Sequence, residues 1–178
     1  MVKVSRNILI KSTSPYSKRR IDEPLEKYLG RLTHLYMNNK DIDDVGEALR
    51  SCTSLRVLYL YENHLTKIPD MSMSPNLTHL YLQQNDITRI HNLDALFNLE
   101  KLYLDLSASG VNNLQGLECL QYLERLDVGF NQLSEESEVL TFLSKMSRLS
   151  ELNISENPIM KNTKINDKII VATKALGT

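Results

Sequence analysis

Residues 55–68 read LRVLYLYENHLTKI, and the same arrangement of leucines, one asparagine and a closing isoleucine returns in residues 77–90 as LTHLYLQQNDITRI. Related phrases can be aligned along most of the chain, spaced by 22 to 26 residues. The phrases begin at Leu32, Leu55, Leu77, Leu99, Leu123 and Leu149. Repetition at this period is typical of a solenoid, in which one structural unit stacks on the next. A solenoid offers an extended surface, which favours binding of another protein.

Counted from its first leucine, each phrase carries apolar residues at places one, four and six. Places four and six alternate with polar residues, which predicts a short strand with one buried face. Place nine follows the strand where the chain must turn, and it holds an asparagine at Asn63, Asn85, Asn131 and Asn157. This side chain can bond backbone groups left unpaired in the turn, so stacked copies are predicted to form a ladder.

The two ends of the stack need caps. Burying about six Leu or Ile side chains gives at most roughly 10–18 kcal/mol, whereas ordering about 22 residues costs roughly 1–2 kcal/mol each. We therefore expect an N-terminal cap and basic arm over residues 1–31, repeats over 32–159 and a capping helix over 160–178. The acidic start Asp22-Glu23-Pro24 predicts a helix near residues 22–30. The helix expected to cover the last repeat presents Ile165, Ile169, Ile170 and Ala172.

The formal net charge of −1 hides an uneven distribution. Residues 1–31 carry +5, residues 32–156 carry −9 and residues 157–178 carry +3. An acidic repeat body argues against the solenoid itself binding nucleic acid. The basic run Lys18-Arg19-Arg20 is typical of a solvated terminus. Contact with an acidic partner such as tubulin or RNA is the alternative interpretation.

The cysteines and the hydropathy of the chain indicate the cellular compartment of the protein. No stretch reaches the roughly 18 apolar residues of a membrane span, and the N-terminus has no hydrophobic signal core. Cys52 and Cys119 lie three repeats apart on the predicted convex side. At about 4.8 Å per strand that is roughly 14 Å, beyond the reach of a disulfide at about 7 Å. We therefore expect a cytoplasmic protein without membrane association.

Strand geometry predicts which side chains face a partner. With places one, four and six buried, places three, five and seven point outward on the concave sheet. Place three holds His34, Val57, His79, Lys101, Arg125 and Glu151. Place five holds Tyr36, Tyr59, Tyr81, Tyr103, Asp127 and Asn153. Place seven holds Asn38, Tyr61, Gln83, Asp105, Gly129 and Ser155. All of these except Gly129 and Ser155 form the predicted protein-binding face.

The tyrosine column at place five has two compatible interpretations. Aromatic pairs on neighbouring strands stabilise a sheet by roughly 0.2–1 kcal/mol each. Tyrosine is also enriched at binding hot spots, and a row of exposed rings is more apolar area than a monomer usually leaves uncovered. The column changes at the fifth phrase to charged and polar residues. The face is therefore predicted to have an aromatic half and a charged half.

Two irregularities interrupt the pattern. The fourth phrase has two extra residues before Val111 and no asparagine at place nine, so the ladder is expected to break there. The fifth phrase continues into an apolar pattern that favours a helix on the convex side, with Ser134 or a neighbour as its N-cap. Both are interpreted as ordinary variation in loop length.

No constellation typical of catalysis is present. The sequence has no phosphate-binding glycine loop, no Cys or His pair at metal spacing and no nucleophile beside a base. His34 and His79 share a column, but the strand of Val57 separates them by about 9–10 Å. We therefore expect no enzyme activity, no metal and no cofactor.

The phrases VLYLYENHLTKI, NLTHLYLQQNDITRI and NLEKLYL resemble the SDS22-like class of leucine-rich repeats, and most narrowly the protein phosphatase 1 regulatory subunit 42 family. The resemblance implies an α/β solenoid with a parallel concave sheet, a helical or 3-10 convex side and helical caps. It also implies a non-enzymatic subunit that binds the phosphatase 1 catalytic subunit through the concave face. The usual docking pattern, basic–Val/Ile–x–Phe/Trp, is missing. Arg56-Val57-Leu58-Tyr59 comes close to it, but this segment is predicted to be a core strand with Leu58 buried, so it cannot leave the sheet to dock.

Three functions remain open. The first is a monomeric adaptor that regulates a phosphatase 1-type enzyme. The second is a cytoskeletal, centrosomal or ciliary scaffold that contacts tubulin or dynein, similar to the dynein light chain of the same repeat class. The third is a ribonucleoprotein component resembling the leucine-rich subunit of the U2 particle.

Overall fold

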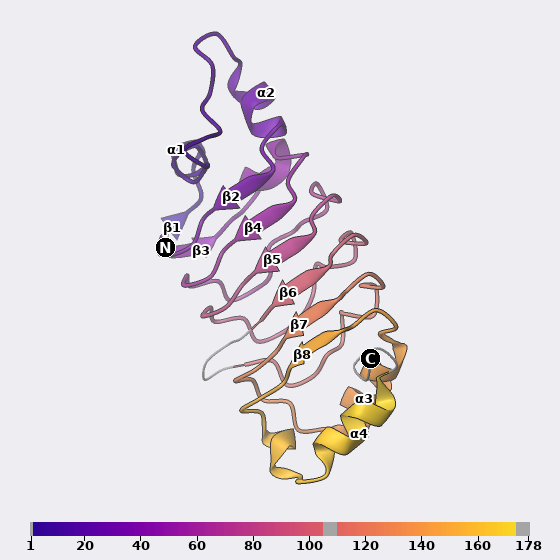
Figure 1. Ribbon diagram of the computed structural model, residues 1–178. Helices are drawn as coiled ribbons and strands as arrows, with labels where there is room; N and C mark the ends of the chain where they lie inside the picture. Colours follow the sequence, from indigo (N-terminus) through magenta and orange to yellow (C-terminus); the bar gives the residue numbers. More distant parts are fainter. Residues whose placement is uncertain (1, 105–109, 174–178) are drawn as a thin grey trace.

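The computed structural model describes residues 2–104 and 110–173. Each of the six phrases contributes one short strand, and these strands form a single six-stranded parallel sheet in chain order. The strands are β2 (His34–Tyr36), β4 (Val57–Tyr59), β5 (His79–Tyr81), β6 (Lys101–Tyr103), β7 (Arg125–Asp127) and β8 (Glu151–Asn153). Each residue of one strand pairs with the residue at the same place in the next. The predicted solenoid is confirmed, and Figure 1 shows its strands side by side.

The leucines of the phrases form one continuous core between the sheet and the convex side. The central leucines Leu35, Leu58, Leu80, Leu102 and Leu126 are fully buried. Leu152 holds the same place in β8 but is only partly buried, because β8 is the last strand of the sheet. Each repeat is thus covered by its neighbours, as a solenoid requires.

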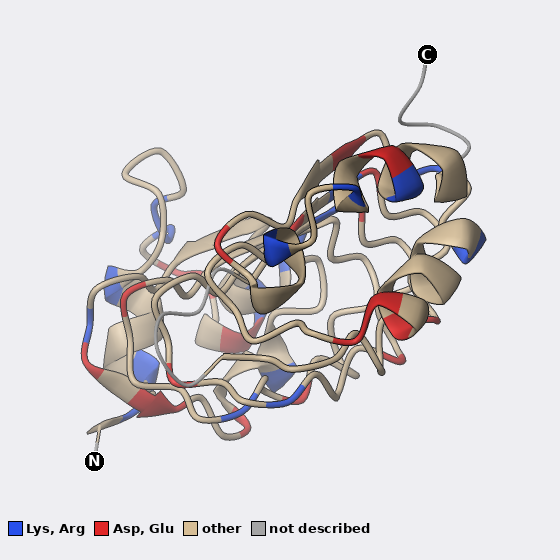
Figure 2. Cartoon of the chain, turned by 90° about the horizontal axis from the view of Figure 1, so that it is seen from below, with Lys and Arg blue, Asp and Glu red and all other residues tan. Residues whose placement is uncertain are grey.

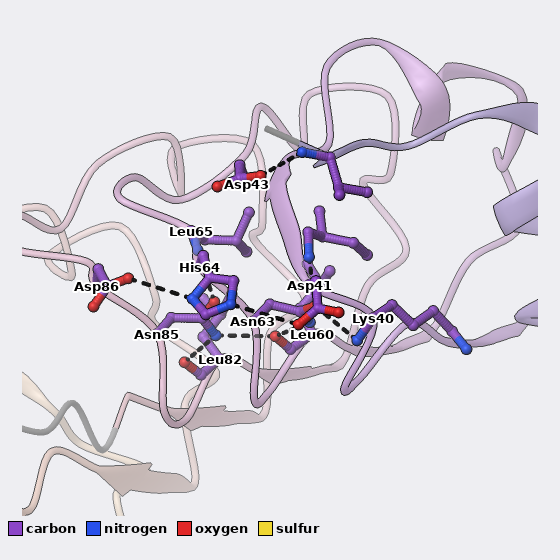
Figure 3. A network of polar contacts seen from close by, with 12 residues as sticks. Lys40, Asp41, Asp43, Leu60, Asn63, His64, Leu65, Leu82, Asn85 and Asp86 are labelled. Carbon is purple, nitrogen blue, oxygen red and sulfur yellow. Dashed lines mark hydrogen bonds and ion pairs between the residues drawn. The ribbon is translucent and has the colours of Figure 1, made fainter.

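The asparagine ladder is confirmed and joins each turn to the previous one (Figure 3). The side-chain nitrogen of Asn85 donates to the carbonyl oxygens of Leu82 and Leu60, each at 2.9 Å, and its oxygen accepts from the amide of Leu65 at 3.0 Å. Asn63 makes the same kind of bonds one repeat earlier. Asn131 and Asn157 repeat them further on. Place nine of the fourth phrase is Ser107, which lies outside the described residues.

The residue before each of these turns adopts a left-handed backbone conformation. This place holds Asn39, Glu62, Gln84, Phe130 and Glu156, with φ between 51° and 55°. The reversal turns the chain out of the sheet, and after Glu62, Gln84, Phe130 and Glu156 it brings the following asparagine into the ladder. Left-handed φ is uncommon for residues other than glycine, so the tight turn is imposed by the stacked repeats.

The N-terminal segment covers the first strand of the sheet. It contains β1 (Val2–Lys3), α1 (Arg6–Lys11) and α2 (Leu25–Gly30), and the helix predicted near residues 22–30 is α2. The amide of Tyr36 donates to the carbonyl oxygen of Ser12 at 2.6 Å, so this segment pairs with the edge of β2. β1 pairs with β3 (Ile42–Asp44), a contact that the sequence analysis did not predict.

The convex side carries turns, the 3-10 helix η1 (Ala48–Ser51) and the helix α3 (Glu136–Lys145). The N-cap of α3 is Glu135, the neighbour of Ser134, which agrees with the prediction of Ser134 or a neighbour. The 3-10 helix η2 (Pro158–Lys161) leads into α4 (Ile165–Ala172), and α4 is linked to α3 by an ion pair between Lys168 and Glu136. None of the helices in the two described ranges combines the length and apolarity needed to cross a membrane.

One residue of α4 contradicts the predicted cap. Ile165 and Ile169 are buried, but the side chain of Ile170 is 55% exposed. The first two residues lie four positions apart and share a helix face, whereas Ile170 is rotated away from that face. Ile170 therefore does not cover the last repeat.

Candidate protein-binding face

The tyrosines at place five stack as one column across β2, β4, β5 and β6. The ring centroids of Tyr36 and Tyr59 lie 5.0 Å apart, and those of Tyr59 and Tyr81 lie 4.6 Å apart. Tyr81 and Tyr103 continue the column at 4.6 Å, with ring planes only 8° apart. These spacings match the distance between neighbouring strands, because the parallel register puts each ring over the next. The predicted cross-strand stacking is confirmed.

The column is a neutral surface with a polar edge. Burial, followed by the neighbouring phenols, raises the pKa of Tyr59 and of Tyr81. Their hydroxyl groups therefore stay protonated at physiological pH. Tyr36 is the most open ring, at 40% exposure, and Tyr61 packs edge-on against Tyr59 at 6.4 Å. The column presents aromatic edges and hydroxyl groups rather than charge.

Tyr103 connects the aromatic half to the charged half. Its hydroxyl oxygen accepts a hydrogen bond from Nη1 of Arg125 at 3.1 Å, and the Arg125 guanidinium also pairs with the carboxylate of Glu151. The hydrogen bond to Glu151, and then the one to Tyr103, raises the pKa of Arg125. Arg125 is thus a fixed cation between the two halves.

The column at place three is more varied than predicted. His34 is exposed and His79 is half-buried, and each ring Nδ1 lies within 3.0 Å of the hydroxyl of the preceding threonine. Burial, followed by the charge of Lys101, lowers the pKa of His79, which is therefore neutral at physiological pH. Over residues 2–104 and 110–173 no group of three His, Cys, Asp or Glu residues is placed to bind a metal.

Val57 is a correction to the predicted face. Its side chain is only 8% exposed. It lies in register between His34 and His79, whose larger side chains flank it on the neighbouring strands. A short side chain between two longer ones is covered by them, so Val57 offers a partner little surface.

The remaining predicted residues differ in their exposure. At place seven, Asn38, Tyr61 and Gln83 are half-buried. Asp105 lies outside the described residues. Lys101, Tyr103, Arg125 and Asp127 are half-buried, and Glu151 and Asn153 are exposed. Among the described residues, the structure thus brings the predicted ones together on one sheet face, on which Val57 is covered by its neighbours.

Phe130 is a surface residue that the sequence analysis did not select. It follows Gly129 at the edge of the face, is 52% exposed and has a left-handed φ of 53°. An aromatic residue in that conformation is a genuine outlier. A signal was available in the alignment, because the equivalent place in the other described repeats holds only Asn, Glu or Gln.

Basic and acidic residues are distributed around the solenoid rather than gathered on separate faces. Figure 2 shows both signs in the loops and helices at either end of the molecule. On the turns next to the asparagine ladder, His64 lies between Asp41 at 3.6 Å and Asp86 at 4.0 Å. This mixed distribution leaves the tyrosine column as the most distinctive surface feature.

Comparison with known proteins agrees with the fold. Residues 30–87 and 53–114 match the family described as Leucine rich repeat, so the repeats in this part of the chain are leucine-rich repeats. An internalin (inlF) from Listeria monocytogenes superposes with a TM-score of 0.66 at 25% sequence identity, covering 82% of this chain and 41% of that protein. The predicted α/β leucine-rich repeat solenoid is confirmed. Leucine-rich repeat proteins as a class mediate protein–protein interaction and are typically not catalytic.

Two further structures share the fold. The functional domain of InlJ from Listeria monocytogenes has a TM-score of 0.53 at 23% identity, covering 74% of this chain and 32% of that protein. The Arabidopsis receptor kinase HAESA, in complex with the peptide hormone IDA and the co-receptor SERK1, has a TM-score of 0.50 at 22% identity. It is matched over 65% of this chain and 20% of its own length. The chain thus spans less than half the length of each of these proteins.

Proposed function

We propose that this chain is a non-catalytic adaptor that binds a partner protein through its concave face. The observation that carries the proposal is the column of four stacked tyrosines, whose centroids lie 4.6–5.0 Å apart. Stacking already holds these rings in place, so a partner would not have to order them on binding. Tyrosine is enriched at binding hot spots, and the centre of an interface is depleted of charge.

The fold supports this use of the surface. The receptor kinase HAESA, which shares this fold, forms a complex with a peptide hormone and a co-receptor. In the present chain, the aromatic half would supply the apolar centre of the interface. The histidines, Lys101 and Arg125 beside it would supply the polar rim.

The partner we propose is the catalytic subunit of a phosphatase 1-type enzyme, bound in the cytoplasm. The resemblance to the SDS22-like class lies in strand residues such as Tyr59, His79 and Tyr103, which occupy the concave face. Leu58 is fully buried, so the segment Arg56–Tyr59 cannot leave the sheet to act as a docking peptide. Binding would therefore use the concave face itself.

A cytoskeletal scaffold is the second candidate, and an exposed loop favours it. Lys18, Arg19 and Arg20 are exposed, and the flanking Tyr16 and Ile21 are 97% and 99% exposed. Basic and apolar side chains presented together suit an acidic protein surface such as that of tubulin. This contact would lie outside the tyrosine column.

The test is affinity capture from cell lysate, followed by direct binding to purified phosphatase 1 catalytic subunit. Wild type is compared with a variant carrying Tyr59→Ala, Tyr81→Ala and Tyr103→Ala. The matched control is Tyr122→Ala, because Tyr122 is also exposed but packs against Arg148 away from the column. We expect wild type and the control to bind the phosphatase and the triple variant to lose it.

The stack contributes to stability, so circular dichroism must show that the triple variant is folded. A single Tyr81→Ala variant provides the same comparison with less disturbance. A folded tyrosine variant that binds the phosphatase as tightly as wild type would refute the concave-face proposal. Co-sedimentation with microtubules that is lost on changing Lys18, Arg19 and Arg20 to Ala would support the scaffold instead.

A further inference from the structure

A pocket opens on the concave face where the tyrosine column ends. It has a volume of about 220 Å³ and is lined by residues of β6, β7 and β8. Asp127 and Asn153 follow Tyr103 in register at place five. Their side chains are smaller than a tyrosine ring, so the space that rings fill over β2 to β6 is open over β7 and β8.

The pocket carries one carboxylate, that of Asp127, which no cation of the described residues neutralises. Arg125 and Glu151 form an ion pair, so their charges largely cancel. Oδ1 of Asp127 accepts a hydrogen bond from the amide of Gly129 at 3.1 Å, which orients the carboxylate. No Lys, Arg or His among residues 2–104 and 110–173 forms an ion pair with Asp127. The local charge of the pocket is therefore negative.

The rest of the lining is apolar or accepts hydrogen bonds. The backbone of Leu126 and Leu152 lies beneath the opening, and the side chains of both residues, at place four, point into the core. One face of the Tyr103 ring is covered by Tyr81, and its neighbour on the other side is the small Asp127. The Asn153 side chain is held by bonds to the amide and hydroxyl of Ser155, at 3.1 and 2.7 Å.

We propose that this pocket receives one basic side chain, arginine or lysine, from the partner protein. The alkyl part of such a side chain would lie along the open face of the Tyr103 ring, and its cation would reach Asp127. An acidic side chain would be repelled by Asp127 and Glu151. A neutral apolar side chain would desolvate Asp127 without compensation. The proposal rests on the concave-face function and specifies the charge of its partner.

The charge of the repeat body supports a basic ligand. Residues 32–156 carry a formal charge of −9. An acidic surface raises the local concentration of cationic groups and increases their rate of association. A basic side chain on the partner would thus be attracted first by the solenoid and then held by Asp127.

The test uses short peptides, so it does not depend on knowing the partner. Acetyl-Gly-Gly-Arg-Gly-Gly-amide, its lysine counterpart and its citrulline counterpart are titrated into the full chain. The backbone amide signals of Leu126, Asp127 and Leu152 are followed by nuclear magnetic resonance. Citrulline has nearly the shape of arginine but no charge. The arginine and lysine peptides are expected to shift these signals saturably, and the citrulline peptide to bind at least about tenfold more weakly.

Asp127→Asn is the diagnostic variant, because the asparagine retains the oxygen that accepts from Gly129. This variant should lower the affinity for the arginine peptide about tenfold. The control Asp86→Asn removes one charge from an exposed turn near His64 and should leave the affinity unchanged. Equal binding of the arginine and citrulline peptides would refute the proposal that the pocket receives a basic side chain. Unchanged binding of the arginine peptide by Asp127→Asn would refute it as well.

The two proposals fail in different ways. If the tyrosine variant loses its partner while Asp127→Asn binds both peptide and partner as wild type does, the pocket is refuted and the concave-face function stands. If the peptides bind as expected but the folded tyrosine variant still captures its partner, the adaptor proposal is refuted. In that case the pocket stands as a site for a basic side chain.

Discussion

The hydroxyl oxygen of Tyr103 accepts a hydrogen bond from Nη1 of Arg125 at 3.1 Å, across the boundary between β6 and β7. This contact joins the last ring of the tyrosine column to the first charged residue beyond it. Arg125 is held on its other side by Glu151. The aromatic half and the charged half are therefore mechanically connected, and a change at Tyr103 should affect both.

Tyr103→Phe removes this hydrogen bond but leaves the stacked ring in place. We expect the free energy of unfolding to fall by about 1 kcal/mol, because the bond is lost from a partly buried site. Urea denaturation provides the measurement. Tyr36→Phe is the control, since no hydrogen bond of the Tyr36 hydroxyl is found in the described part of the chain, and it should change stability little. Equal losses in the two variants would contradict the role of the Tyr103–Arg125 bond.

Asn85→Ala should destabilise the solenoid more than a typical surface change. The Asn85 side chain is buried and bonds Leu65, Leu60 and Leu82, so alanine leaves backbone groups unpaired in two turns. We expect a loss of at least about 2 kcal/mol in the free energy of unfolding.

The matched control for this change is Asn98→Ala. Asn98 is exposed and donates one side-chain bond, to the carbonyl oxygen of Pro75 at 3.0 Å. It should cost less than about 1 kcal/mol. If thermal or urea unfolding gave the same loss for both variants, the ladder would not be a main source of stability.

The period of the leucines was enough to predict the sheet, its register and the tyrosine column. Places four and six fix which side of each strand is buried, so Tyr59 and Tyr81 had to fall on one face. The asparagine ladder followed for the same reason. These features depend on the local spacing of residues, and that spacing recurs in every repeat.

Features that depend on contacts between unlike segments could not be predicted in this way. Val2 pairs with Ile42 although no repeat relates them. Val57 is covered because of the size of its neighbours in register, and Ile170 is exposed because it lies on a different face of α4 from the buried Ile165 and Ile169. The pocket beside Asp127 forms because no ring stands at place five of β7. A missing side chain leaves no motif in the sequence, so the pocket could not be predicted.

Glu23 should make the N-terminal cap sensitive to acid. The hydrogen bond from Arg31, at 2.6 Å, lowers the pKa of the Glu23 carboxyl from 4.5 to about 2. A lowered pKa in the folded state stabilises the fold above pH 4.5, and this contribution is lost as the pH falls from 4.5 toward 2. Glu23→Gln should therefore be less stable than wild type at pH 6, and the difference should shrink by pH 3.

Urea unfolding at the two pH values measures this difference. Glu26→Gln serves as the control, because Glu26 forms an exposed ion pair with Arg6 at 3.1 Å, and exposed pairs contribute little. A Glu23→Gln difference that stays constant between pH 6 and pH 3 would contradict the assignment.

Gly116→Ala should be more damaging than Gly46→Ala. Both glycines have positive φ, so each alanine incurs a backbone cost of roughly 1–2 kcal/mol. A Cβ at position 116 would also lie 2.8 Å from the carbonyl oxygen of Ile90, whereas position 46 has open space. We expect the melting temperature to fall clearly further for Gly116→Ala. Equal shifts would show that the turn around Gly116 can move away from Ile90.

The two thiols should differ in reactivity while the protein is folded. Cys52 is fully buried, and burial raises the pKa of its thiol from 9 to about 11, which reduces its thiolate fraction about 100-fold. Cys119 is half-buried, and burial also raises its pKa. Iodoacetamide at pH 8, followed by peptide mass spectrometry, should modify Cys119 first, because the thiolate must both form and be reached. In urea the two rates should converge. Equal rates in the folded protein would mean that the convex side around Cys52 opens as readily as the surface.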